Sequence, residues 1–158
     1  MILKKNFLNL LFIISIFLLD RVSKLIVIQI TNDTGEAKIS LTSFLNLNLI
    51  WNDGIAFGLF SFSEKIYYNL LTLVIILVIF IVFWMIIRTN GIEKLSFMMI
   101  FGGSIGNVFD RIYYSSVPDF IDIHFNNYHW FIFNVADIFI SIGVLLLIYL
   151  EFFRKNRI

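Results

Sequence analysis

The sequence predicts an all-α integral membrane protein with four transmembrane helices and a small β-sheet in the loops on the outer side of the membrane. Of its 158 residues, 59% are hydrophobic and 15% are charged, which is too apolar for a water-soluble domain of this length. A helix needs about 20 apolar residues to cross a hydrocarbon core of about 30 Å. Four runs meet that length, at residues 7–30, 66–87, 95–114 and 130–153. They leave room for a single domain spanning residues 1–158.

The first predicted helix, 7–30, follows two lysines, a pattern that a cleavable signal peptide shares. Asp20 and Arg21 stand where such a peptide needs small residues at its cleavage site, so we predict a retained helix. Asp20 and Lys24 are four residues apart with the acid first, the favourable order for an ion pair on one helix face. We expect this pair to have a structural or positioning role. Arg21 is expected to reach outward to lipid headgroups.

The loop after the first helix contains residues 44–49, where apolar and polar side chains alternate as in a strand with one buried face. Asn52, Asp53 and Gly54 follow, and this combination favours a turn. Two interpretations of the segment remain open. It is an ordinary hairpin, or it is a backbone edge that receives an extended peptide by strand addition.

The second helix, 66–87, is followed after a short turn by the third, 95–114. Gly102 and Gly106 in the third helix form a small-xxx-small pair that permits close helix contact. The sequence leaves open whether that contact lies within the bundle or between chains. A monomer is the expected state.

A polar group follows the glycines of the third helix. Asn107, Asp110 and Arg111 have the spacing of side chains on one helix face. Arg111 keeps its proton, so it is expected to hold the neighbouring Asp110 ionised. We expect these residues to support a site rather than to transfer protons.

Charge distribution predicts the orientation of the chain. Lysine and arginine gather at both ends of the sequence and around the turn between the second and third helices. The loops at 31–65 and 115–129 instead hold two lysines against six acidic residues. Both termini are therefore expected in the cytoplasm. At a rise of about 1.5 Å per residue, Asp20, Asp110 and Asp137 each lie about 22–26 Å from the inner basic residues. One site near the outer face is expected.

Two aspartates have no basic neighbour in the sequence. Asp119 follows the third helix, and Pro118 restricts how its carboxylate is presented. Asp137 comes near the outer start of the fourth helix, with Asn134 one turn before it and Ala136 leaving backbone room. Two such carboxylates in an apolar site do not both ionise easily, so they share a proton. This predicts aspartic-protease chemistry, in which the pair activates water against a peptide carbonyl.

Two other kinds of protein, a transporter and a structural scaffold, fit some features of the sequence. A small proton-coupled transporter also needs intramembrane carboxylates, but no inverted repeat or pair of broken helices is visible. A structural scaffold would explain the glycines but not the two aspartates. A net charge of +1 argues against nucleic acid, and the absence of cysteine excludes thiol chemistry. No cofactor and no metal are expected, and His124 and His129 are interpreted as loop or interface residues.

Five motifs, in order along nearly the whole chain, resemble those of the lipoprotein signal peptidases, also called signal peptidase II. The motifs are Asp20-x-x-Ser23-Lys24, Asn52-x-Gly54-x-Ala56-Phe57-Gly58, Gly102-Gly103-x-x-Gly106-Asn107-x-x-Asp110-Arg111, Val117-x-Asp119-Phe120 and Phe133-Asn134-x-Ala136-Asp137. The resemblance implies an extracytoplasmic sheet and loop cradle over the site, with Asp119 and Asp137 as the catalytic pair. It further implies that several polar residues support the substrate or the pair, namely Asn52, Asn107, Asp110, Arg111 and Asn134, with Gly54 and Ala136 beside them.

The family resemblance also implies a substrate and a location. The enzyme would cleave bacterial prolipoproteins just before a cysteine that carries diacylglycerol. It would do so in the cytoplasmic (inner) membrane, with the active site near the outer face and the acyl chains remaining in membrane lipid. Pro118 is the main local variation, and it should alter the presentation of Asp119 more than the chemistry.

Overall fold

The computed structural model of the protein describes residues 2–54, 65–126 and 128–155. Ala56, Phe57 and Gly58 of the second motif lie outside the described residues.

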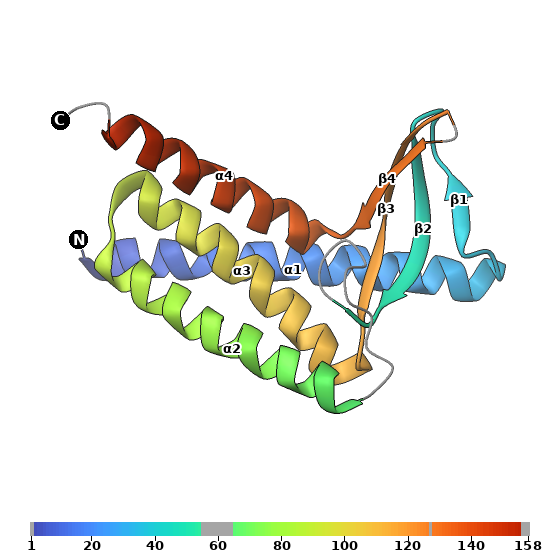
Figure 1. The fold of residues 1–158 in the computed structure, drawn as a ribbon, viewed down its shortest axis with the longest axis horizontal. Helices are drawn as coiled ribbons and strands as arrows, with labels where there is room; N and C mark the ends of the chain where they lie inside the picture. The colour runs from blue at the N-terminus through green and yellow to red at the C-terminus, as the bar shows by residue number, and fades with distance from the viewer. Residues whose placement is uncertain (1, 55–64, 127, 156–158) are drawn as a thin grey trace.

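Four helices run alongside one another and carry a sheet at one end (Figure 1). They are α1 (Ile2–Thr34), α2 (Lys65–Arg88), α3 (Gly91–Tyr114) and α4 (Val135–Lys155). The beginning of α1, the end of α4 and the α2–α3 turn lie together at the opposite end from the sheet (Figure 1). All four predicted helices are confirmed. The first extends beyond the predicted 7–30 at both ends, because backbone hydrogen bonding continues into polar residues that an apolar run does not include.

The sheet has four antiparallel strands in the order β1-β2-β3-β4. They are β1 (Lys38–Ser40), β2 (Leu45–Asn52), β3 (Val117–Phe125) and β4 (Tyr128–Phe133). The predicted strand at 44–49 is confirmed as part of β2. The small sheet therefore combines the loop after α1 with the segment between α3 and α4.

The predicted start of the fourth helix was wrong, and so was the loop alternative for His124 and His129, which were expected in a loop or at an interface. Residues 130–133 belong to β4, and the helix begins only at Val135. The prediction rested on the number of apolar residues, but a run of aromatic and β-branched residues fits a strand equally well. His124 and His129 lie in β3 and β4 rather than in a loop.

Glycines bring α3 close to both α1 and α4. A Cβ atom at Gly102 would lie 3.1 Å from Ile16, and one at Gly106 would lie 2.6 Å from Asp20 Oδ2, both on α1. A Cβ atom at Gly103 would lie 2.6 Å from the carbonyl oxygen of Ala136 on α4. The small-xxx-small pair therefore packs within the bundle against α1, while Gly103 permits the close approach of α4.

Apolar side chains dominate the outer surface of the bundle. Two helical stretches, Ile66–Arg88 and Val135–Phe153, are long and apolar enough to cross a membrane, and only 6% and 17% of their apolar windows are buried. Their apolar side chains therefore point outward. The buried charged residues lie inside the bundle and the sheet instead: Asp20, Arg21 and Lys24 on α1, Asp110 and Arg111 on α3, Asp119 and Asp122 on β3, and Asp137 on α4.

Candidate active site

The site is organised at the first turn of α4. Asn134 precedes the helix, and its side-chain Oδ1 accepts a hydrogen bond from the Asp137 backbone N–H at 3.0 Å. In return, the Asn134 backbone N–H donates to Asp137 Oδ2 at 3.2 Å. This reciprocal arrangement is a capping box, which satisfies free donors at a helix start. The local sequence thus both begins the helix and holds the Asp137 carboxylate in one orientation.

Asn134 also joins the two candidate catalytic carboxylates. Its Nδ2 donates to Asp119 Oδ1 at 2.6 Å. The other oxygen, Asp119 Oδ2, accepts from Asn52 Nδ2 at 2.8 Å, and Asp137 Oδ1 accepts from Asn107 Nδ2 at 2.9 Å. All four carboxylate oxygens therefore receive an N–H donor from three asparagines. Asp119 and Asp137 are only 3% and 8% exposed.

The environment of Asp119 favours its protonated form. The pKa of Asp119 is raised to about 6, chiefly by burial and next by the nearby charge of Asp137. Hydrogen bonds from Asn52 and Asn134 oppose this rise, because they favour the ionised carboxylate. A carboxyl whose pKa is shifted toward neutral pH, beside a second carboxylate, has the properties of an acid–base pair.

A second polar cluster surrounds Lys24. Its ammonium donates to Asp20 Oδ2 at 2.8 Å, to Asp110 Oδ2 at 2.7 Å and to Asn107 Oδ1 at 2.9 Å. The predicted Asp20–Lys24 ion pair is confirmed, and both side chains are fully buried. Because Asn107 accepts from Lys24 and donates to Asp137, its amide connects the charged cluster to the carboxylate pair.

Asp20 also contacts α4 directly. Its Oδ1 accepts the backbone N–H of Ala136 at 2.9 Å, in the first turn of that helix. A carboxylate at a helix N-terminus is favoured by the free N–H groups and by the helix dipole. Ala136 is completely buried, which leaves no room there for a larger side chain. The first and last motifs are therefore in direct contact.

Two expectations about arginine were wrong. Arg21 does not reach outward to headgroups: it is 9% exposed, binds Asp110 and lies 5.0 Å from the centre of the Phe109 ring. Arg111 forms no described ion pair with Asp110. It donates instead to the carbonyl oxygen of Gly54. Adjacent residues on a helix point in different directions, so Asp110 and Arg111 do not face each other.

No sequence pattern indicates Arg21 as a partner of Asp110, since the two residues lie on different helices. Arg111 also lies 5.5 Å from the centre of the Tyr68 ring on α2. Asn52 Oδ1 accepts the backbone N–H of Gly54 at 2.9 Å, in the turn predicted from this segment. The described part of that turn thus approaches both Asp119 and Arg111.

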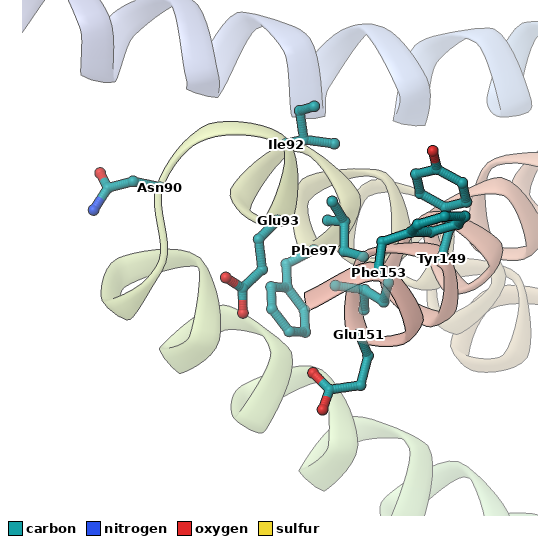
Figure 2. A pocket seen from close by; sticks show the side chains of 9 residues that line it. Asn90, Ile92, Glu93, Phe97, Tyr149, Glu151 and Phe153 are labelled. Atoms are coloured by element: carbon teal, nitrogen blue, oxygen red, sulfur yellow. The ribbon is translucent and has the colours of Figure 1, made fainter. Parts of the chain in front are cut away.

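Two hollows on the surface differ in their relation to these clusters. One of about 820 Å³ lies between the start of α3 and the end of α4, with Glu93 and Glu151 on its wall (Figure 2). It contains none of the residues of either polar cluster. A smaller hollow of about 280 Å³ is lined by Asp137 and by side chains of β4 and α4, including Trp130 and Phe133. Of the two carboxylates, Asp137 therefore borders a largely apolar hollow, whereas Asp119 is not part of its lining.

No group of three or more histidine and carboxylate side chains that could hold a metal ion is found among the described residues.

Comparisons with known proteins agree with this geometry. Residues 12–153 match the sequence model of a family described as Signal peptidase (SPase) II. A lipoprotein signal peptidase of Pelagibacter ubique (strain HTCC1062) is 48% identical over 98% of this chain and 93% of its own length. One of Francisella tularensis subsp. novicida (strain U112) is 40% identical over 75% of this chain and 76% of its own length.

A solved structure is also similar. It is a bacterial membrane enzyme determined by the in meso method at 2.3 Å resolution, with a TM-score of 0.76 and 26% identity. The match covers 94% of this chain and 90% of that chain. The resemblance inferred from five motifs is thereby confirmed over nearly the whole sequence. This chain belongs to the signal peptidase II family.

Proposed function

We propose that this chain is a membrane aspartic endopeptidase that removes the signal peptide from diacylglyceryl-modified bacterial prolipoproteins, cleaving before the lipidated cysteine. Asp119 and Asp137 are its catalytic pair. The observation that carries this assignment is the Asn134 amide, which hydrogen-bonds Asp119 and Asp137 at once. The substrate class rests on kinship with lipoprotein signal peptidases. Because the chain belongs to the signal peptidase II family, no observation favours a transporter or a structural scaffold.

The proposed reaction uses one proton held by the pair. The ionised carboxylate takes a proton from a water molecule as that water attacks the scissile carbonyl carbon. The protonated carboxyl donates a hydrogen bond to the carbonyl oxygen and stabilises the tetrahedral intermediate. Transfer of a proton to the amine nitrogen then breaks the C–N bond. The amide donors around Asp119 and Asp137 fix both carboxylates before substrate arrives, so little reorganisation is needed.

The remaining motif residues support the pair in this proposal. Asn52, Asn107 and Asn134 orient the carboxylates, while Asp110 holds Lys24 close to Asn107. The other positions supply backbone contacts or close packing, namely Asp20, Gly54, Gly102, Gly106, Arg111 and Ala136.

All four helices are proposed to span the bacterial cytoplasmic (inner) membrane, with both termini in the cytoplasm and the sheet outside. The beginning of α1, the end of α4 and the α2–α3 turn share one end of the bundle (Figure 1), and basic residues are concentrated in these segments. The carboxylate pair lies where the helices meet the sheet, which supports a site near the outer face. A peptide bond at that depth meets water while its acyl chains stay in lipid. The enzyme is proposed to work as a monomer without a cofactor.

Cleavage of a purified diacylglyceryl-prolipoprotein in detergent tests the proposal. Wild type should cleave before the modified cysteine, whereas Asp119→Asn and Asp137→Asn should bind substrate without cleaving it. Asp33→Asn, at an exposed position of α1, serves as the matched control and should cleave normally. Activity that survives Asp119→Asn but vanishes in Asp110→Asn would move the pair to Asp110. A wild type that neither binds nor cleaves this substrate would reject the proposed substrate class.

A further inference from the structure

Strand β3 carries a second buried carboxylate, three residues after Asp119. Asp122 is completely buried, and its Oδ2 accepts from Asn46 Nδ2 of β2 at 3.1 Å. Its Oδ1 lies 2.7 Å from His129 Nδ1 of β4. Asn46 Oδ1 in turn accepts from the hydroxyl of Ser40 on β1 at 2.8 Å. A row of side-chain hydrogen bonds therefore crosses all four strands.

The Asp122 carboxylate is held in its ionised form. Burial raises the pKa of Asp122, but hydrogen bonds from His129 and Asn46 outweigh it and leave the pKa below its usual value. An ionised carboxylate only accepts hydrogen bonds, so His129 Nδ1 is the donor. Charge-assisted hydrogen bonds of this kind are about twice as strong as those between neutral groups.

Regular pairing of β3 with its neighbours is interrupted on both sides, close to Asp119. On the β2 side the register shifts between Leu47 and Ile50, and Ile50 is paired with Asp119. On the β4 side the register shifts between Asp122 and His124. Such irregularities weaken the backbone ladder that fixes strand register. A slip of one residue would turn every side chain of β3 to the opposite face, including the Asp119 carboxylate.

Asp122 lies between these two interruptions and is bonded to both neighbouring strands. The bond to Asn46 fixes β3 against β2 on the far side of the first shift. The bond to His129 spans the second shift, because His129 is paired with His124 in the backbone ladder. Five residues after His129 the chain reaches Asn134, whose amide contacts Asp119.

We infer that Asp122 and His129 are positioning residues for the peptidase reaction: the bond between them sets the register of β3 so that Asp119 faces Asp137. This inference rests on the proposed function. The two residues act through β3 and β4 and do not touch the carboxylate pair themselves.

Two variants of His129 distinguish a positioning role from an effect on the overall stability of the protein. Asparagine places its amide nitrogen close to where Nδ1 lies, whereas glutamine places it one bond further out. The His129 side chain is 43% exposed, so both variants should fold. We expect His129→Asn to keep the wild-type kcat. We expect His129→Gln to lower kcat by about tenfold or more at unchanged KM, because a small misplacement of a catalytic group is costly.

A register measurement makes the test independent of activity. The chain has no cysteine, so a pair introduced as Ile121→Cys and Phe133→Cys, which are partners in the ladder, forms the sole possible disulfide. Oxidation should crosslink this pair efficiently beside the native His129 or His129→Asn, and poorly beside His129→Gln or Asp122→Ala.

The outcomes are distinct. Reduced crosslinking together with a reduced kcat in His129→Gln supports the inference. Wild-type crosslinking and wild-type kcat in both His129→Gln and Asp122→Ala overturn it. Equal losses of kcat in His129→Asn and His129→Gln also overturn it, because the position of the donor would then be irrelevant. If the double-cysteine protein with native His129 crosslinks as expected but the wild type cleaves no prolipoprotein, the proposed function is rejected while the register assignment stands.

Discussion

Lys24→Met is expected to destabilise the protein strongly, because Lys24 is the cation shared by two buried carboxylates. The substitution keeps the length of the side chain but removes donors to Asp20, Asp110 and Asn107 at 2.7–2.9 Å. Asp110 keeps its contact with Arg21, whereas Asp20 keeps the Ala136 N–H. Breaking a buried pair by removing one partner costs about 3–5 kcal/mol. For a chain of this length, that corresponds to a fall of about 6–20 °C in melting temperature.

Thermal unfolding followed by tryptophan fluorescence in detergent measures this effect. Lys94→Met, at the inner end of α3, is the matched control and should change stability by less than about 1 kcal/mol. Adding Asp20→Asn to Lys24→Met should recover at least about 0.5 kcal/mol, since it removes one uncompensated charge from a coupled pair. Equal melting temperatures for the two lysine variants would refute the view that Lys24 neutralises the cluster. The same would hold if the double variant were less stable than Lys24→Met alone.

Three further predictions concern the site and its packing. The kcat/KM of wild type should fall as pH rises through about 6, where Asp119 loses its proton. Asn52→Ala should move this fall to higher pH, because it removes a donor that favours the ionised carboxylate. The pH–rate profiles of both enzymes test this. Gly106→Ala should lower the free energy of unfolding by about 1–3 kcal/mol and reduce activity, since its Cβ would lie 2.6 Å from Asp20 Oδ2 on α1. Ser104→Ala on the same helix is the control and should hardly change thermal unfolding. Arg111→Lys should lower kcat/KM although the charge is kept. Lysine lacks the planar guanidinium that both lies over the Tyr68 ring and binds the Gly54 carbonyl oxygen. Equal kinetics of the two enzymes would contradict that role.

Most residues of the proposed site could be predicted from the sequence. Asp119 and Asp137 stood out because carboxylates in an apolar chain are costly and these two have no basic neighbour in sequence. The Asp20–Lys24 pair followed from helical spacing, which is a short-range property. The partners of Asp110 could not be found in this way, because Lys24 and Arg21 reach it from another helix.

The sequence by itself determined the number of helices, the small sheet and the residues of the catalytic motifs. These features depend on apolar run length, alternation and local spacing, all of which lie along the chain. The tertiary structure alone decided that residues 130–133 form a strand, that Arg111 binds Gly54 rather than Asp110, and that asparagine amides hold all four carboxylate oxygens. The physical reason is that a side chain's partner depends on which helix faces pack together and on strand register. Both are set by close contacts between segments far apart in the sequence.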